Sequence, residues 1–364
     1  MQIWLDACDY SVGAEIVSQL ELLKMAKNAP PWGSKGLINR AGDAFRANRQ
    51  PTQDELAAVE AWRAGHKNVL NTFQAILRTR AKGLGIQVAQ RLKRRWTIID
   101  KLFRQPGMQL ARMDDVAGCR LIFTDISSLR KFRAKFLKAG FKHQTKTTID
   151  KYDYIKHPKA SGYRGVHDIY EYNPKSKQGK PFAGLLMELQ YRTQAQHAWA
   201  TAVEVVSRVT ENQPKFDRGD ERYKEFFRLA SEIIARAHEK SNSVYKDLSD
   251  KKLVDRFISI DSDINVIRML KGLHTIYDER KYGGNMILQF SQKGLAIHEV
   301  GNDKDATAEY FRLEKENPND DIVLVNADTF DEIRSAYRNY FSDPSEFLDY
   351  INKGCLALGG RGCL

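Results

Sequence analysis

Apolar side chains recur every three or four positions between residues 56 and 77, which is the spacing of one face of a helix. The segment Thr52-Gln53-Asp54-Glu55 that precedes them has the form of a capping box, in which the first and last side chains satisfy each other's backbone amides. Gly83 and Gly85 then interrupt the pattern. The sequence therefore predicts one long helix that ends near Lys82.

Short apolar runs replace this spacing between residues 88 and 208. Three of them have the length of buried strands: Leu121–Thr124, Val166–Tyr172 and Leu185–Tyr191. Helical spacing returns at Ser127–Ala139 and at Ala195–Val206. Because strands and helices alternate, we expect an α/β core that consists of a mixed sheet with flanking helices.

The last third of the chain has a different pattern. Residues 220–280 are charged, with apolar positions at helical spacing, and a Gly-Gly pair at 283–284 ends this stretch. A hairpin is expected at 286–300, followed by a helix, a strand and two helices at 307–316, 322–326, 330–341 and 345–352. This order indicates a smaller C-terminal α+β domain.

A chain of 364 residues exceeds the usual size of a single core, so several domains are expected. The patterns divide it into an N-terminal helical region (1–69), an α/β domain (70–210), a helical linker region (211–282) and a small acidic α+β domain (283–364). No run of 18 apolar residues and no signal-peptide pattern is present, so we expect a cytoplasmic protein without a membrane partner.

Charge and cysteine usage refine this picture. The net charge is +12, yet ten acids stand against three bases between residues 301 and 332, whereas nine Lys or Arg stand against one acid between residues 71 and 104. Phosphate-rich ligands are therefore attracted to the first half of the chain and repelled by the second. The four cysteines form no C-x-x-C pair and are expected to be reduced, with a bridge between Cys355 and Cys363 as the alternative.

Two segments of the α/β region suggest a phosphate site with a metal. A helix over 91–102 would place Lys93, Thr97 and Lys101 in one row, and two ammonium groups with a hydroxyl suit a polyphosphate. Asp115 stands at the start of one apolar strand and Glu188 interrupts another, where a carboxylate is costly unless it is paired or metal-bound. Two such carboxylates suit Mg²⁺, which takes one or two of them together with substrate phosphates.

The loop from Asp153 to His167 is a candidate nucleotide site. Tyr163 lies beside Arg164 and close to Lys159, so an aromatic ring can stack on a base while cations meet phosphates. A solvated basic loop is the alternative interpretation, which the neighbouring motifs disfavour.

Together these segments resemble the synthetase domain of the RelA/SpoT family, which moves a pyrophosphate group from ATP to a ribose 3′-hydroxyl. The family pattern R-x-K-x-x-x-S-I-x-x-K is present at 91–101 with Thr97 in place of Ser, and D-x-x-G-x-R is intact at 115–120. The D-Y-I-x-x-P-K-x-x-G-Y-x-S-x-H loop is present at 153–167 with Gly165 in place of Ser, and E-x-Q-x-R-T at 188–193. The resemblance covers roughly residues 70–208.

The resemblance implies a role for each matched residue. ATP, the co-substrate, would be bound by Arg91, Lys93, Thr97, Lys101 and Arg120, with the two arginines on either side of the adenine. Asp115 and Glu188 would be catalytic and hold Mg²⁺, and Glu188 could also take the 3′-hydroxyl proton. The acceptor would be bound by Tyr163, Lys159, Arg164, His167 and Gln190, with Arg192 and His197 in support.

Two acceptors are compatible with the resemblance, and we expect the tRNA 3′ end ahead of a guanosine nucleotide. Some family members make the alarmone (p)ppGpp from GDP or GTP. Others are toxins that modify the 3′ end of tRNA, and some of these are fused to a C-terminal domain that restrains them and senses phage proteins. The tract with Arg78, Arg80 and Lys82 favours tRNA, since several phosphate contacts need several cations, and the acidic C-terminal domain is compatible with a built-in restraint.

Other classes of function fit less well. An inactive nucleotide- or RNA-binding module is a third hypothesis, which the presence of both Asp115 and Glu188 disfavours. The single His-Asp pair lies inside the acceptor loop, so we expect no hydrolase domain. A P-loop motif is lacking, which argues against an ordinary NTPase.

Overall fold

The computed structural model describes residues 30–210, 219–272, 284–291, 294–300, 303–317, 320–327 and 343–364. The first elements are α2 (Lys35–Arg46) and α3 (Gln53–Ala81). Helix α3 begins with the predicted capping box: the Glu55 amide donates to Thr52 Oγ1 over 3.2 Å, and the Thr52 amide donates to Glu55 Oε2 over 2.9 Å. The expected long helix is confirmed, and it crosses the position at which the sequence pattern divided regions 1–69 and 70–210.

A mixed sheet forms the centre of the molecule, which confirms the predicted fold class. Its strands are β1 (Gln87–Leu92), β2 (Ala117–Phe123), β3 (Gln144–Thr145), β4 (Tyr152–Asp153), β5 (Val166–Glu171) and β6 (Leu186–Thr193). They lie in the order β1-β2-β6-β5-β3, with β4 also paired to β5. Strands β2 and β6 are parallel and the other pairs are antiparallel.

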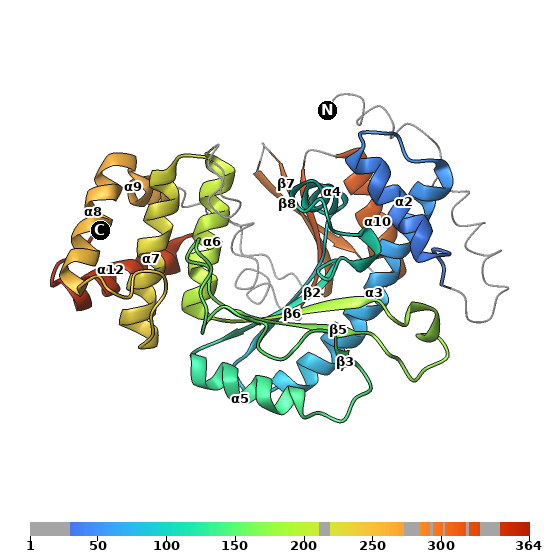
Figure 1. Cartoon of the computed structure of the whole chain (residues 1–364), viewed down its shortest axis with the longest axis horizontal. Coiled ribbons are helices and arrows are strands. Elements are labelled where there is room, and N and C mark those ends of the chain that lie inside the picture. Colours follow the sequence, from blue (N-terminus) through green and yellow to red (C-terminus); the bar gives the residue numbers. More distant parts are fainter. Residues whose placement is uncertain are drawn as a thin grey trace.

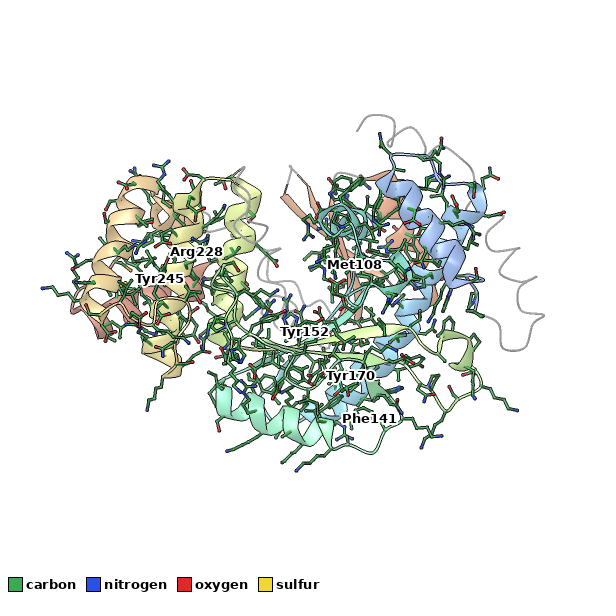
Figure 2. The ribbon with its side chains drawn as sticks, viewed as in Figure 1. Met108, Phe141, Tyr152, Tyr170, Arg228 and Tyr245 are labelled. Carbon is green, nitrogen blue, oxygen red and sulfur yellow. The ribbon has the colours of Figure 1, made fainter. Side chains whose placement is uncertain are left out.

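Two helices cover one face of this sheet. Helix α5 (Ile126–Leu137) and helix α3 pack against the apolar side chains that alternate along β2, β5 and β6. In Figure 2, Tyr170 and Phe141 lie below the strands on the side of α5, and their rings are 6.1 Å apart. The opposite face carries the polar positions of the same strands, because successive side chains of a strand point to opposite faces.

A helical bundle continues from the sheet and forms a second core. It contains α6 (Gln194–Val209), α7 (Glu221–Glu239), α8 (Asp250–Ile264), α9 (Val266–Gly272) and the C-terminal α12 (Ser345–Gly359). The bundle lies on the left in Figure 1, and Figure 2 places Arg228 and Tyr245 within it. Gly354 allows α12 to approach α7 closely, since an added Cβ would lie only 2.6 Å from Ile233 Cγ2.

A second sheet packs on the other side of the molecule. Strands β7 (Gly284–Ser291), β8 (Gly294–Val300) and β9 (Asp321–Ala327) form it in the order β8-β7-β9, with helix α10 (Asp303–Glu316) against them. The expected hairpin is thus confirmed. Tyr310 and Leu313 of α10 belong to the same apolar cluster as Phe73 of α3. The described residues of segment 283–364 therefore lie in two places, with α10 and its sheet beside α3 and β1, and α12 in the bundle.

The sequence pattern was wrong about the segment 91–102. Arg91 and Leu92 belong to β1, and helix α4 begins only at Arg95 and ends at Arg104. The reason is strand pairing, since Arg91 lies opposite Gly118 of β2. The helix expected at 330–341 lies outside the described residues. Among the helices that are described, none is both long and apolar enough to span a membrane.

Candidate active site

Polar side chains gather on the sheet face that α3 and α5 leave uncovered. Glu188 and Gln190 of β6 lie opposite Gly118 and Arg120 of β2, and His167 of β5 lies opposite Gln190. These five positions are half-buried, while the residues between them are buried on the other face. The alternation of the strands therefore brings three separate motifs to one surface.

One side of this surface is a cluster of opposite charges. Lys93 Nζ donates to Asp115 Oδ2 over 2.8 Å, and Lys101 Nζ donates to Asp115 Oδ1 over 2.8 Å and to Asp114 Oδ1 over 3.2 Å. Burial alone would raise the pKa of Asp115, but the two ammonium groups outweigh it and hold that pKa well below its usual range. Lys93 and Lys101 were expected in one row of a single helix. Instead, Lys93 directly follows β1 and Lys101 lies on α4, and both side chains contact Asp115.

The structure places the two neighbouring acids differently from the expectation for Asp115. Asp115 does not lie on a strand, because β2 begins at Ala117. The neighbouring Asp114 also accepts a hydrogen bond from Lys101. The ammonium group of Lys101 therefore bridges both acids, and the net effect of burial, Asp115 and Asp114 is a raised pKa of Lys101.

The second carboxylate of the site is held by side chains of β5 and β6. Glu188 Oε1 lies 2.8 Å from His167 Nδ1, and Gln190 Nε2 donates to Glu188 Oε2 over 2.6 Å. Burial favours the neutral acid, but His167 and Gln190 outweigh it, so the pKa of Glu188 is lowered. The like charge of Asp115 acts in the opposite direction and raises the pKa of Glu188.

The ring of Tyr163 lies next to this carboxylate. Tyr163 Oη is 2.6 Å from His167 Nε2 and accepts from Arg192 Nε over 3.2 Å. Burial opposes ionisation of Tyr163, but Arg192 and His167 lower its pKa to about 7. The ammonium group of Lys159 lies 4.3 Å from the ring centroid of Tyr154 and 5.3 Å from that of Tyr163. Tyr154 was not predicted as a site residue from the sequence, although its place in the same loop motif was a signal.

Guanidinium groups line the part of the surface next to β1. Burial, together with the like charges of Arg192 and Arg91, lowers the pKa of Arg120 to about 10. Arg120 Nε donates to Gln190 Oε1 over 3.4 Å. Three guanidinium groups that repel one another make a strongly positive surface, which a polyanion can neutralise. Helix α4 adds the half-buried hydroxyl of Thr97, which has no hydrogen-bond partner among the described residues.

Two predicted acceptor-side residues are buried below this surface. Arg164 is 3% exposed and forms an ion pair with Glu239 of α7. Its Nε and Nη2 atoms have no hydrogen-bond partner among the described residues. Glu239 also accepts from Gln196 Nε2 over 3.0 Å at the start of α6. His197, in the first turn of the same helix, is also 3% exposed.

The basic tract lies elsewhere. Arg78, Arg80 and Lys82 are at the end of α3, on the sheet face opposite Glu188. The guanidinium carbon of Arg80 lies 5.8 Å from the ring centroid of Phe136 in α5. The structure therefore does not bring these three cations together with the acceptor-side residues.

The donor set fits a magnesium ion only when substrate completes it. Asp115 and Glu188 are two carboxylates that repel each other, a situation that a divalent cation relieves. Among the described residues no group of three or more His, Cys, Asp or Glu side chains is arranged to hold a metal. Since Mg²⁺ commonly uses one or two carboxylates and substrate phosphates, the remaining ligands would come from the nucleotide and water.

The part of the chain that carries this surface is similar to known proteins. Residues 90–210 match the family model described as a region found in RelA / SpoT proteins. GTP pyrophosphokinase YjbM of Bacillus subtilis is 30% identical over 116 residues, which are 31% of this chain and 52% of that protein. An uncharacterized protein of Mycobacterium tuberculosis is 28% identical over 181 residues, which are 49% of this chain and 60% of that protein. The chain thus spans only 52% and 60% of the lengths of these curated relatives.

A solved structure is also similar to part of the molecule. The small alarmone synthetase 1 from Bacillus subtilis, in the crystal structure bound to its product pppGpp, matches with a TM-score of 0.43 and 23% identity. The match covers 50% of this chain and 93% of that one. The family match over 90–210 contains every polar side chain of the sheet face described above. Residues 90–210 are therefore similar to the region found in RelA / SpoT proteins.

Proposed function

We propose that this protein transfers the β,γ-pyrophosphate group of ATP to a ribose 3′-hydroxyl. The observation that carries the proposal is the pairing of two differently held carboxylates on one surface. Asp115 is held between Lys93 and Lys101, while Glu188 is held by His167 and Gln190. The side of Asp115 supplies cations for a polyphosphate, and the side of Glu188 supplies a base for a hydroxyl. Phosphoryl-type transfer requires both groups.

The donor side has the groups that ATP needs. Lys93 and Lys101 form ion pairs with Asp115 in this structure, and they would contact the phosphates when ATP is bound. Arg91 and Arg120 offer guanidinium planes for the adenine, which a lysine could not provide. Thr97 contributes a hydroxyl without a partner among the described residues. Bound Mg²⁺ would supply neutralisation of the charge that develops on the phosphates.

The acceptor side has a base that is kept ionised. The ribose 3′-oxygen attacks the β-phosphorus, AMP leaves, and the proton of the hydroxyl passes to the Glu188 carboxylate. His167 and Gln190 hold both carboxylate oxygens in place, so Glu188 stays charged although it is half-buried. Tyr163 and Tyr154, with Lys159 over both rings, form an aromatic and cationic surface for a nucleobase with its phosphates.

A guanosine nucleotide is the acceptor that this geometry favours. The relative YjbM is described as a GTP pyrophosphokinase. The basic tract at Arg78, Arg80 and Lys82 is a weaker argument for tRNA as the acceptor than its composition suggested, since it lies on the sheet face opposite Glu188. The 3′ end of tRNA remains the second candidate, favoured by the exposed Lys156, His157 and Lys159 in the acceptor loop.

The second candidate includes a biological role. A tRNA-modifying enzyme of this kind would inhibit growth, and its acidic C-terminal segment would restrain it until a trigger such as a phage protein binds. The contacts of α10 favour a supporting role for that segment, because its Glu314 accepts from the backbone amide of Arg95 and pairs with Arg63. Glu314→Gln weakens this contact and leaves α12 in the bundle, so it discriminates between the roles, since loss of a restraint would raise activity and toxicity.

One experiment tests the proposed reaction and its acceptor together. The full chain is incubated with Mg²⁺ and ATP labelled in the β-phosphate, in parallel with GDP, GTP and bulk tRNA. Transfer of label to GDP or GTP supports the first candidate, and transfer to tRNA supports the second. AMP release without labelled acceptor, or no reaction with any of the three, would contradict the proposal.

A further inference from the structure

One buried arginine connects the C-terminal sheet module to the donor side of the site. Arg63 of α3 is 1% exposed. Its Nη1 donates to Glu314 Oε2 over 2.5 Å and its Nη2 donates to Tyr310 Oη over 2.7 Å, both on α10. Its Nε donates to the carbonyl oxygen of Lys93 over 2.9 Å. A single guanidinium thus joins α10 to the turn between β1 and α4.

The same glutamate also caps α4. Glu314 Oε1 accepts from the backbone amide of Arg95 over 3.1 Å. Arg95 is the first residue of α4, and the preceding Arg94 makes no side-chain cap. The first amides of a helix lack partners within the helix, and the helix dipole favours a negative charge there. Glu314 supplies that charge from a segment more than two hundred residues away in the sequence.

These contacts bear on the atoms that would hold ATP. Lys93 directly follows β1, and Thr97 and Lys101 lie on α4. Their side chains reach the phosphate region only if the turn between strand and helix keeps its direction. Arg63 holds the carbonyl of Lys93 and Glu314 holds the amide of Arg95, so both ends of the turn are fixed by one ion pair.

We propose that Glu314 is a positioning residue for the ATP side of the site, and that the module of β7–β9 and α10 completes this side. The inference rests on the function proposed above. Removal of one partner of a buried ion pair leaves the other charge without compensation, so the effect is not confined to the surface of α10. Tyr310 and Leu313 pack in the core shared with α3, which keeps Glu314 in register with Arg63.

The test is Glu314→Gln, which keeps the shape and removes the charge. The control is Glu316→Gln, since Glu316 is exposed on the same helix and pairs with Arg312 there. We expect Glu314→Gln to weaken binding of a non-hydrolysable ATP analogue by roughly tenfold, the equivalent of one charge-assisted hydrogen bond, while acceptor affinity stays within twofold. Hydrogen exchange of the amides at 95–98 should accelerate in this variant and not in the control.

Several outcomes would overturn the inference. Unchanged analogue binding and unchanged exchange at 95–98 would show that Glu314 does not position the turn. An equal loss of affinity for analogue and acceptor would indicate a general loss of structure. If Glu314→Gln does not fold, Tyr310→Phe is the second test, because it keeps the ring and removes one acceptor of Arg63. Unchanged hydrogen exchange of the amides at 95–98 in this variant would contradict the inference. Both readouts are independent of turnover, so a wild-type protein that transfers no pyrophosphate would refute the proposed function alone.

Discussion

His167 Nδ1 lies 2.8 Å from Glu188 Oε1, and this contact joins the acceptor loop to the central strand. The other nitrogen of the same ring, Nε2, lies 2.6 Å from Tyr163 Oη. One imidazole therefore fixes both the candidate base and the candidate stacking ring. Because the two residues come from β5 and β6, a shift in register between these strands would separate them.

Replacement of Glu188 by Gln should abolish pyrophosphate transfer. The variant keeps the hydrogen-bonding shape of the side chain but removes the base and a metal ligand, and loss of a general base costs about 10²–10⁴-fold in rate. The measurement is single-turnover transfer of label with saturating ATP. Glu171→Gln is the matched control, since Glu171 is near the end of the neighbouring β5 and pairs with Lys146. Near-normal turnover of Glu188→Gln would remove the proposed base.

The contact also predicts how stability depends on pH. Burial lowers the pKa of His167, but Tyr163 and Glu188 outweigh it and raise this pKa to about 9. A folded-state pKa above the unfolded value of about 6.5 means that His167 binds more protons in the folded protein between these values. The contribution of His167 to the free energy of unfolding should therefore fall as pH rises from about 6.5 to 9, by at most about 1.4 kcal/mol per pH unit. The lowered pKa of Tyr163 contributes with the opposite sign between about pH 7 and its unfolded value of about 10, so the two contributions oppose each other in the wild type. Below this window the contribution is fully present.

Denaturant titrations of Tyr163→Phe and of the double variant Tyr163→Phe/His167→Gln at several pH values test this expectation, because Phe removes the opposing titration of Tyr163. The difference in unfolding free energy between the two proteins should shrink as pH rises through the folded-state pKa of His167. Tyr163→Phe should narrow the pH range between the unfolded and folded pKa values of His167, because it removes one of the two partners that raise the folded-state pKa. A difference that is constant from pH 6 to pH 10 would mean that His167 is neutral in the folded protein.

Much of this site was predictable from the sequence, and the parts that were not have a physical cause. Glu188, Gln190 and His167 were predicted together because each lies in a strand motif whose alternation determines its face. The partners of Arg63 and Arg164 were not predicted, because Glu314 and Glu239 belong to helices that are distant in the sequence. A charged position in a helical pattern also gives no sign that it is buried in an ion pair. Helix α4 was predicted too early, since local spacing at 91–94 cannot reveal that β2 pairs with this stretch.

Tyr163→Ala should act mainly on the acceptor. Loss of one stacking contact with a base is worth about 1–3 kcal/mol. Tyr163→Phe separates the two roles of this residue, because it keeps the ring and removes the hydroxyl that contacts His167 and Arg192. We expect the Ala variant to raise the acceptor KM strongly and the Phe variant to lower kcat more than it raises KM. A fall in ATP affinity with intact acceptor affinity would show that Tyr163 contacts ATP and not the acceptor.

Gly165 makes room for the hydroxyl of Tyr163. Its φ of +154° lies in the region that L side chains rarely adopt, and an added Cβ would lie 3.1 Å from Tyr163 Oη and 3.3 Å from the carbonyl oxygen of Tyr191. Gly165→Ser, which restores the residue of the family pattern, should therefore displace Tyr163 from His167 and raise the acceptor KM. Gly107→Ala is the control, since an added Cβ there meets no atom within 4 Å. Unchanged acceptor kinetics of Gly165→Ser would show that the loop relaxes without cost.

Arg164 was predicted to bind the acceptor, and its ion pair with Glu239 gives that prediction a sharp test. Glu239→Gln leaves a guanidinium that is 3% exposed without its charge partner, which should lower the free energy of unfolding by about 3–5 kcal/mol. The double variant Glu239→Leu/Arg164→Leu removes both charges and should be less destabilised than either single variant. If Arg164 acts only as a support for the loop, the folded double variant should keep an acceptor KM close to that of wild type. If Arg164 instead uses its Nε and Nη2 atoms to bind the acceptor, the double variant should be stable and yet lose acceptor affinity, with ATP affinity unchanged.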